Sequence, residues 1–142
     1  MRVLHLEDSA ADAELIAGTL NAEWPQCRSR RAATREEFQD ALETDVFELI
    51  LSDYTLGGYD GLSALELART RCPEKPFIFI SGTIGEERAI EALKRGATDY
   101  VIKDRPTRLV PAIQRALSRA EEAREHGQTE DAVRENRERF RQ

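Results

Sequence analysis

The feature that most constrains the fold is a repeated unit, in which a short apolar run ends at a polar side chain and a segment with helical spacing follows. The runs "FELILSD" and "PFIFIS" are apolar at consecutive rather than alternating positions. That pattern is typical of strands buried on both faces of a parallel sheet. Because such strands are joined through helices that cover the sheet, the repeat predicts an α/β fold.

The segments between the apolar runs carry helix signals. Ser9 is a good N-cap for a helix in "SAADAELIAGTLNAEW", and Thr34 with Glu37 has capping-box spacing ahead of a second helix. Two more helices are expected in "LSALELARTR" and "GEERAIEALKRG", the second closed by Gly96 at its C′ position. Strand and helix therefore alternate along the chain.

The stretch "CRSRRAAT" predicts one further strand, at the sheet edge, where Arg28, Arg30 and Arg31 discourage unwanted pairing. Together with "RVLHLED" and "TDYVIK" it brings the count to five strands. We therefore expect a doubly wound five-stranded parallel sheet with helices on both faces, over residues 1–120. A charged helical extension over residues 121–142 follows.

The charge and the absence of long apolar runs argue against some partners. The 142 residues carry 21 basic and 27 acidic side chains, a net charge of −6, whereas nucleic acids are bound by basic faces. No apolar stretch approaches the roughly 20 residues of a membrane span, and "MRVLHLED" reaches charged residues too early for a secretory leader. Cys27 and Cys72 lack the spacing of a metal or disulfide motif. We expect a cytoplasmic chain that binds neither membrane nor nucleic acid.

The residues that end the strands carry the functional information, because ligands of such sheets bind outside the carboxyl ends of the strands. The expected strand ends present Glu7, Asp8, Asp53, Ser81 and Lys103. If the first and third strands are neighbours, their ends lie roughly 5 Å apart, so the three carboxylates share one pocket. Carboxylates this close together either take up a proton or bind a cation. Mg²⁺, usually held by carboxylates and water, is the expected cofactor.

These side chains suit phosphoryl transfer. Asp53 can be a carboxylate nucleophile that forms an aspartyl phosphate. Lys103 can balance the charge of the transferred phosphoryl group, and the Ser81 hydroxyl can donate to one of its oxygens. Each residue alone has a plainer explanation, since Asp8 or Asp53 could simply cap a helix or turn. Their joint placement at strand ends favours a site.

The segments "HLEDS", "LILSDYTLGGYDG", "FIFISGT" and "DYVIK", in this order and spacing, resemble the receiver domain of two-component response regulators. The resemblance covers residues 2–120 and implies a flavodoxin-like fold with the strand order 2-1-3-4-5. It also implies a phosphoprotein of a phosphorelay, which receives its phosphoryl group from a histidine kinase or phosphotransfer protein. Such a domain takes part in its own phosphorylation and dephosphorylation but is not a stand-alone kinase.

Residue by residue, the resemblance makes Asp53 the phosphoacceptor and places Lys103 at the position of the family's invariant lysine. Asp8 would ligate Mg²⁺ directly and Glu7 mostly through water. Asp53 and the backbone carbonyl of Thr55 would complete the protein ligands. The bond after Lys103 stays open as to cis or trans, because an aspartate stands where the family usually has proline.

Ser81 and Tyr100 match the family's switch pair, in which the hydroxyl moves to the phosphate and the aromatic ring turns inward. Thr55 and Thr83 match positions that tune water access and thereby phosphoryl lifetime. The repacking alters the face of the fourth helix, fifth strand and fifth helix. Homodimerisation is expected through that face or through the C-terminal helix.

The chain's final part resembles the linkers that join receivers to PAS modules and sensor histidine kinases. "ENRERFRQ" is similar to the opening of a PAS domain, so we interpret the chain as the N-terminal receiver of a longer sensor protein. Gly127 is expected to interrupt the helical segment over residues 121–142. The alternatives are a solvated helix and a coiled-coil connector.

Two other functions compete with this interpretation. A hydrolase of the haloacid-dehalogenase type also uses an aspartate nucleophile with Mg²⁺, but it usually has a second aspartate two residues later, where this chain has Thr55. A receiver-like interaction or dimerisation module that is not phosphorylated is the main alternative. Such modules usually lack the aspartate, the acidic pair or the lysine, and here all are present.

Overall fold

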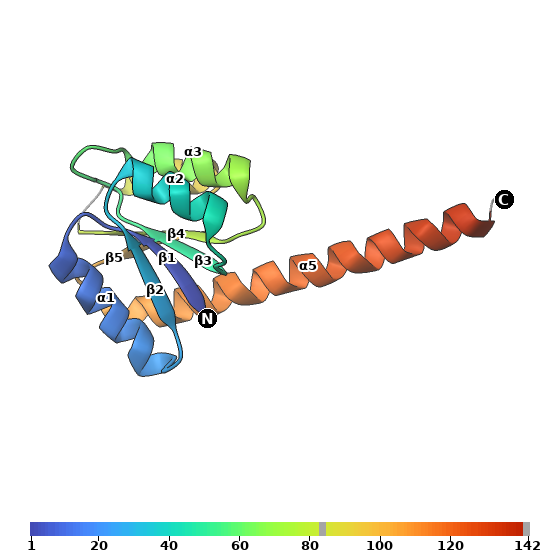
Figure 1. The fold of residues 1–142 in the computed structure, drawn as a ribbon, viewed down its shortest axis with the longest axis horizontal. Helices are drawn as coiled ribbons and strands as arrows, with labels where there is room; N and C mark the ends of the chain where they lie inside the picture. The colour runs from blue at the N-terminus through green and yellow to red at the C-terminus, as the bar shows by residue number, and fades with distance from the viewer. Residues whose placement is uncertain (83–84, 141–142) are drawn as a thin grey trace.

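Strands and helices alternate along the chain as the apolar runs and caps predict (Figure 1). The structure, a computed structural model, describes residues 1–82 and 85–140, with side chains through residue 125. The strands are β1 (Arg2–Leu6), β2 (Arg28–Ala32), β3 (Leu49–Ser52), β4 (Phe77–Ser81) and β5 (Asp99–Ile102). The helices are α1 (Ala10–Glu23), α2 (Arg35–Thr44), α3 (Gly61–Arg71), α4 (Glu86–Lys94) and α5 (Leu109–Phe140), the last preceded by the short 3-10 helix η1 (Pro106–Arg108).

The five strands form one parallel sheet in the order β2-β1-β3-β4-β5, which confirms the predicted topology. In the register, Leu6 at the end of β1 lies opposite both Ala32 of β2 and Ser52 of β3. Ser81 of β4 lies opposite Ile102 of β5. The carboxyl ends of all five strands therefore lie along one edge of the sheet.

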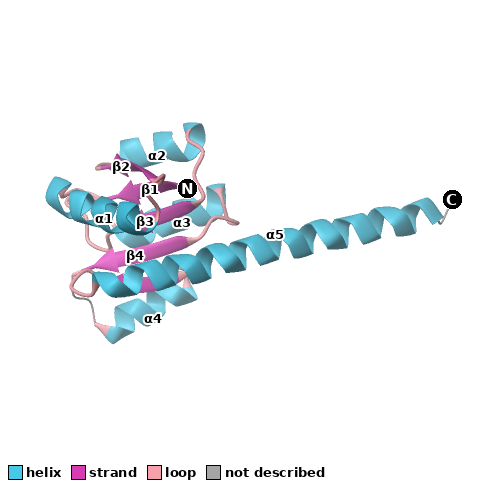
Figure 2. Ribbon diagram, turned by 90° about the horizontal axis from the view of Figure 1, so that it is seen from below, coloured by secondary structure: helices cyan, strands magenta, loops and turns pink. Residues whose placement is uncertain are grey.

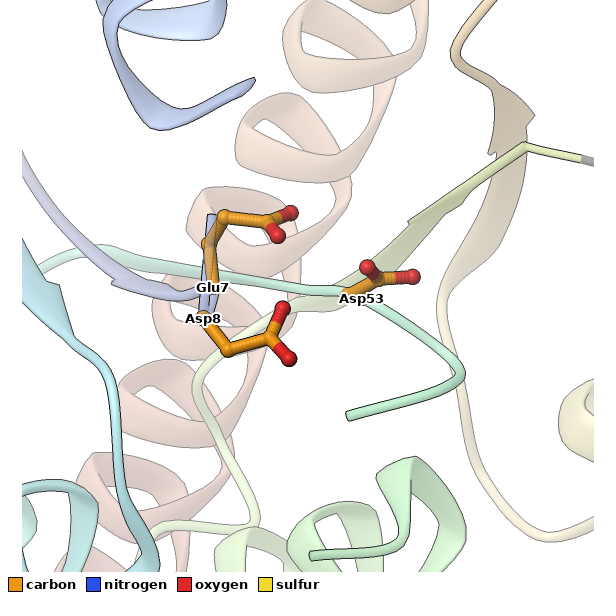
Figure 3. A group of neighbouring side chains, drawn as sticks. All are labelled: Glu7, Asp8 and Asp53. Atoms are coloured by element: carbon orange, nitrogen blue, oxygen red, sulfur yellow. The ribbon is translucent and has the colours of Figure 1, made fainter. Parts of the chain in front are cut away.

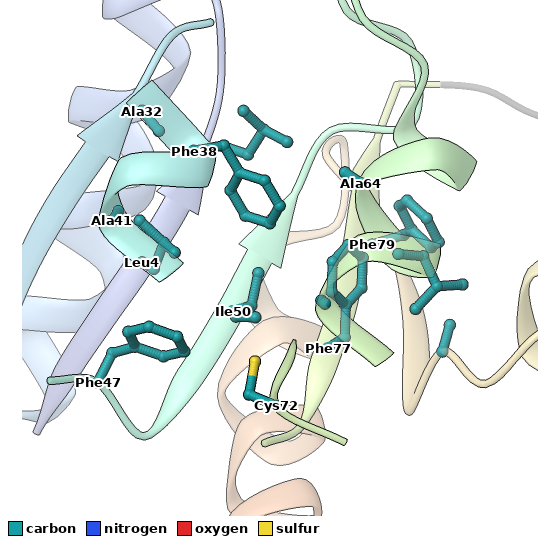
Figure 4. Packing of buried hydrophobic residues seen from close by; sticks show 14 of the residues in the cluster. Leu4, Ala32, Phe38, Ala41, Phe47, Ile50, Ala64, Cys72, Phe77 and Phe79 are labelled. Carbon is teal, nitrogen blue, oxygen red and sulfur yellow. The ribbon is translucent and has the colours of Figure 1, made fainter. Parts of the chain in front are cut away.

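Helices cover both faces of the sheet, so the strands have two cores (Figures 1 and 2). β3 and β4 are buried throughout, and their successive side chains alternate between the two cores. The core beneath α2, α3 and α4 contains Leu4, Phe38, Ile50, Ala64, Phe77 and Phe79 (Figure 4). The core beneath α1 and α5 contains Ile16, Leu20, Leu51, Ile78, Leu109 and Ile113.

Local caps set where several elements begin and end. The Ser9 hydroxyl accepts the backbone N–H of Asp12 at 3.3 Å, and the Thr34 hydroxyl accepts that of Glu37 at 3.2 Å. Gly96, just after α4, has a φ of +109°, a left-handed conformation that favours glycine over any side chain. The predicted caps are thus confirmed.

The C-terminal helix differs from expectation in its continuity. α5 runs for 32 residues without a break, so the prediction that Gly127 interrupts it is wrong. One glycine costs a helix only about 1 kcal/mol relative to alanine, and the surrounding alanine, glutamate and arginine residues are strong helix formers. The C-terminal part of α5 extends away from the sheet (Figures 1 and 2). The expected domain boundary at residue 120 lies inside this helix.

Two further points concern the described part of the chain. Its peptide bonds are all trans, and this includes the bond after Lys103 that the sequence left open. No helix in residues 1–82 or 85–140 is both long and apolar enough to cross a membrane.

Candidate functional site at the carboxyl ends of the strands

The acidic pair follows directly from β1 and is held by the neighbouring strands. The backbone N–H of Glu7 donates to the carbonyl of Ala32 at 2.9 Å, which continues the pairing with β2 by one residue. On the other side, the backbone N–H of Asp53 donates to the carbonyl of Leu6 at 3.0 Å. Glu7 is buried and Asp8 is exposed, so the pair spans from the sheet edge to the surface.

Glu7, Asp8 and Asp53 form one group of carboxylates, as the strand order requires (Figure 3). Each offers an oxygen, and these three oxygens all lie within 4.8 Å of one another. Burial raises the pKa of Glu7, and the nearby Asp53 carboxylate adds to the effect, although Lys103 and the N–H of Ser9 oppose it. Converging oxygen donors of net negative charge fit a hard divalent cation such as Mg²⁺.

The loop after β3 wraps over this group. The N–H of Gly57 donates to Oδ2 of Asp8 at 2.9 Å, and that of Thr55 approaches Oδ1 of Asp53 at 3.4 Å. A Cβ added at Gly61 would lie 2.6 Å from the carbonyl oxygen of Tyr54, so only glycine fits where α3 begins. This close return of the chain places the backbone of Thr55 beside the carboxylates.

Lys103 brings a positive charge to the group from the loop after β5. Its Nζ lies 3.0 Å from Oε2 of Glu7, 3.1 Å from Oδ2 of Asp53 and 2.8 Å from Oδ2 of Asp12. Burial alone lowers the pKa of Lys103, but its hydrogen bonds to Asp12, Glu7 and Asp53 raise that pKa by more, and it ends above its ordinary value. Lys103 is therefore charged and shared among three carboxylates.

Asp12 is a site residue that the sequence did not single out. It lies in the first turn of α1 rather than at a strand end, so the search for strand-terminal residues passed over it. Its place in the first turn of the helix that follows β1 puts Asp12 near that edge, but no sequence pattern specifies its contact with Lys103.

The two switch candidates lie on neighbouring strands. Ser81 is buried at the end of β4, and its carbonyl accepts the backbone N–H of Lys103 at 2.7 Å. Tyr100 in β5 is half-buried, lies opposite Phe79 of β4 and packs against the core beneath α2, α3 and α4. Thr83, expected to tune water access, lies outside the described residues.

Arg31 behaves differently from the other edge arginines. Arg30 forms ion pairs with Asp40 and Asp45 along the exposed edge of the sheet. Arg31 instead donates from Nε to the carbonyl oxygen of Glu7 at 2.9 Å and from Nη2 to that of Asp8 at 2.8 Å. The edge-guarding role predicted for Arg31 is therefore incomplete, because its guanidinium reaches the backbone of the acidic pair.

Comparison with known proteins agrees with this geometry. The family model of the response regulator receiver domain matches residues 3–114. The chain is 34% identical over 105 residues to the response regulator protein FleR of Pseudomonas aeruginosa, covering 72% of this chain and 21% of that protein. It is 35% identical over 118 residues to the nitrogen assimilation regulatory protein NtrX of Azorhizobium caulinodans, covering 81% of this chain and 26% of that protein.

Among solved structures, the crystal structure of NtrX from Brucella abortus superposes with a TM-score of 0.82 at 30% identity, covering 90% of this chain and 29% of that one. The chain thus spans only about a fifth to a quarter of the length of the curated relatives named above. The residues that the family model matches, 3–114, include the carboxylate group and Lys103.

Proposed function

This chain belongs to the response regulator receiver family, and from that premise we propose that Asp53 is its phosphoacceptor. The observation that carries the proposal is the placement of the Asp53 carboxylate. It follows directly after the central strand β3, one of its oxygens lies 3.1 Å from Lys103 Nζ, and it shares the acidic group with Glu7 and Asp8. A nucleophile, a positive charge and a cation-binding group therefore meet at one point.

In the proposed step, an oxygen of Asp53 attacks the phosphorus of a phosphohistidine. The phosphorus–nitrogen bond breaks, and the electron pair leaves with the imidazole of the donor. Lys103 Nζ already contacts Asp53 and would donate to an oxygen of the arriving phosphoryl group. The donor is a histidine kinase or a phosphotransfer protein, the partners with which receiver domains interact.

We assign the Mg²⁺ ligands to Asp8, Asp53 and the carbonyl of Thr55, with Glu7 acting mostly through water. When bound, Mg²⁺ would offset the negative charge that the carboxylates and the phosphoryl oxygens bring together. The hydrogen bonds from Gly57 and Thr55 to Asp8 and Asp53 support this assignment by holding the loop that carries the Thr55 carbonyl beside the carboxylates.

The proposed switch runs from Ser81 to Tyr100. The Ser81 hydroxyl donates to a phosphoryl oxygen, and the ring of Tyr100 turns inward to fill the space that this movement vacates. New phosphate contacts would thus shift a population between two packings of one fold. The output surface is the face of α4, β5 and α5, where Ile90 and Leu93 expose apolar area.

The wider context is also a proposal. We infer a cytoplasmic receiver over residues 1–120, joined by the α5 extension to a PAS or sensor module that "ENRERFRQ" begins. The length and continuity of α5 support this connector role, since the helix continues far beyond its contacts with the sheet. Homodimerisation through α5 or through the α4, β5 and α5 face would couple two such receivers.

The test is intact mass spectrometry after incubation with acetyl phosphate. We expect the mass of one phosphoryl group to be added in Mg²⁺ but not in EDTA, and the addition to be absent in Asp53→Asn. Asp104→Asn is the matched control, since it removes an exposed carboxylate one residue after Lys103 and should be modified like wild type. No adduct, under conditions that modify a known receiver, would favour the unphosphorylated interaction module instead.

A further inference from the structure

The backbone that carries the acidic pair is held beyond the end of the sheet. Ladder hydrogen bonds stop at the N–H of Glu7, which donates to Ala32, and at the carbonyl of Leu6, which accepts from Asp53. The next two carbonyls, those of Glu7 and Asp8, accept from the single guanidinium of Arg31 at 2.9 and 2.8 Å. One side chain thus extends the ladder by two bonds.

The residue type and its place on β2 explain how this is achieved. Arg31 lies opposite His5 in the parallel register, so its extended side chain reaches the two peptides that follow β1. Guanidinium presents several N–H groups in a fixed planar fork, and two of them can satisfy two acceptors at once. A lysine ammonium has no such fork.

These two bonds restrain the direction of the carboxylates. The carbonyls of Glu7 and Asp8 point to Arg31, which fixes the peptide planes on either side of Asp8. With the backbone held there, the Asp8 side chain reaches the loop after β3, where its Oδ2 accepts the N–H of Gly57 at 2.9 Å. The Glu7 carboxylate forms an ion pair with Lys103 and accepts the backbone N–H of Ser9.

We propose that Arg31 is a positioning residue for the divalent cation site, and that it orients Glu7 and Asp8 through their backbone carbonyls. This inference rests on the proposed function, because it assumes that these carboxylates bind Mg²⁺. Outer partners that orient metal ligands commonly change metal affinity about 10-fold or more when they are removed.

The sign of the effect separates positioning from simple charge. Arg31 carries a positive charge close to the cation site, so removing that charge should strengthen Mg²⁺ binding if electrostatics alone mattered. Removing a positioning residue should weaken it, because the carboxylates lose their preset directions. The two explanations therefore predict opposite changes.

The experiment is calorimetric titration of the full chain with Mg²⁺ at fixed ionic strength. We expect Arg31→Met to bind about 10-fold more weakly than wild type. Arg31→Lys, which keeps the charge but can reach one carbonyl at a time, should fall between them. Arg28→Met is the matched control, because it removes an equal charge from the same exposed strand without a contact to either carbonyl, and its affinity should equal that of wild type or exceed it slightly.

A second readout needs no metal. Amide hydrogen exchange of Gly57, measured in EDTA, should quicken in Arg31→Met and stay unchanged in Arg28→Met, because the Gly57 N–H is held by Asp8. Thermal unfolding in EDTA checks that both variants fold.

The outcomes are distinguishable. If folded Arg31→Met binds Mg²⁺ as tightly as wild type, or more tightly, the inference is overturned and the proposed function stands. If Arg28→Met loses as much affinity as Arg31→Met, positioning is likewise refuted. If wild type itself takes no Mg²⁺, the proposed function fails together with the inference.

Discussion

Replacing Lys103 with methionine should destabilise the metal-free protein and make it depend on Mg²⁺ for stability. The ammonium of Lys103 contacts carboxylates of Glu7, Asp12 and Asp53 at 3.0, 2.8 and 3.1 Å. Methionine keeps the length of the stem and removes the charge. The three carboxylates then lose their shared partner while their mutual repulsion remains.

The size of the effect follows from these distances and from burial. At an effective dielectric constant of about 20, a pair of unit charges about 3 Å apart interacts by about 5 kcal/mol. The loss of one partner from a buried ion pair typically costs about 3–5 kcal/mol of stability. Because Asp12 is 40% exposed, water screens part of the interaction, so we expect about 3 kcal/mol. That corresponds to a melting temperature lower by about 10 °C for a domain of this size.

The charge of Lys103 should be constant across the ordinary pH range. Its pKa in the folded state is raised above that of the unfolded chain, which is about 10.4. Stability from a group with a raised pKa is fully present below the unfolded pKa and is lost as pH rises through the folded one. Lys103 of wild type is therefore charged at both pH 7 and pH 8.5, and any change with pH in the difference between wild type and variant comes from carboxylates that lose its ammonium, Glu7 above all.

The assay is thermal unfolding in EDTA and in a Mg²⁺ series. Mg²⁺ should raise the melting temperature of Lys103→Met more than that of wild type, because the variant has no competing positive charge among the carboxylates. Lys94→Met, at an exposed position in the last turn of α4, is the control and should lie within about 0.5 kcal/mol of wild type. Equal melting temperatures of wild type and Lys103→Met in EDTA, or equal responses to Mg²⁺, would refute the reasoning.

Other predictions concern the scaffold. Gly61→Ala should lower the free energy of unfolding in urea by about 2 kcal/mol or more, since the added Cβ would lie 2.6 Å from a backbone oxygen. Gly18→Ala, whose Cβ would meet nothing within 4 Å, should stabilise α1 by up to about 1 kcal/mol. A more stable Gly61→Ala than Gly18→Ala would contradict the geometry. Burial raises the pKa of Cys27 and of Cys72, so both thiols should react slowly with Ellman's reagent at pH 7.5 and rapidly in urea; rapid reaction of the native protein would disagree with their burial. Thr34→Ala should cost about 1 kcal/mol by removing the cap of α2, and no change in urea unfolding would count against that cap.

The predictable parts of the site are those that local pattern and parallel topology place together. Asp53 and Lys103 follow apolar runs, and in a parallel sheet every run ends at the same edge, so their place at one edge followed from the parallel topology. The capping signals of Ser9 and Thr34 were also sufficient, because each involves a hydrogen bond to a backbone group three residues away. Gly127 shows the limit of such signals, since one helix-weakening residue was outweighed by its neighbours in α5.

Two site residues were out of reach of this reasoning. Asp12 contacts Lys103 across a separation of 91 residues, and Arg31 contacts Asp8 across 23. Each contact joins a side chain to a group on another part of the chain, a carboxylate and ammonium for Asp12 and Lys103 and a guanidinium and backbone carbonyl for Arg31 and Asp8. No periodicity in the chain specifies which of several acidic or basic side chains completes such a link.

By itself, then, the sequence determined the alternation of elements and the side chains Glu7, Asp8, Asp53 and Lys103 that follow the strands, because burial period and capping act over a few residues, whereas the strand order came from the resemblance to receiver domains. Only the tertiary structure decided that Lys103 is shared with Asp12 and that Arg31 holds the carbonyls of the acidic pair. Those contacts depend on ångström-scale distances between packed elements, where one side-chain length separates a hydrogen bond from an exposed charge.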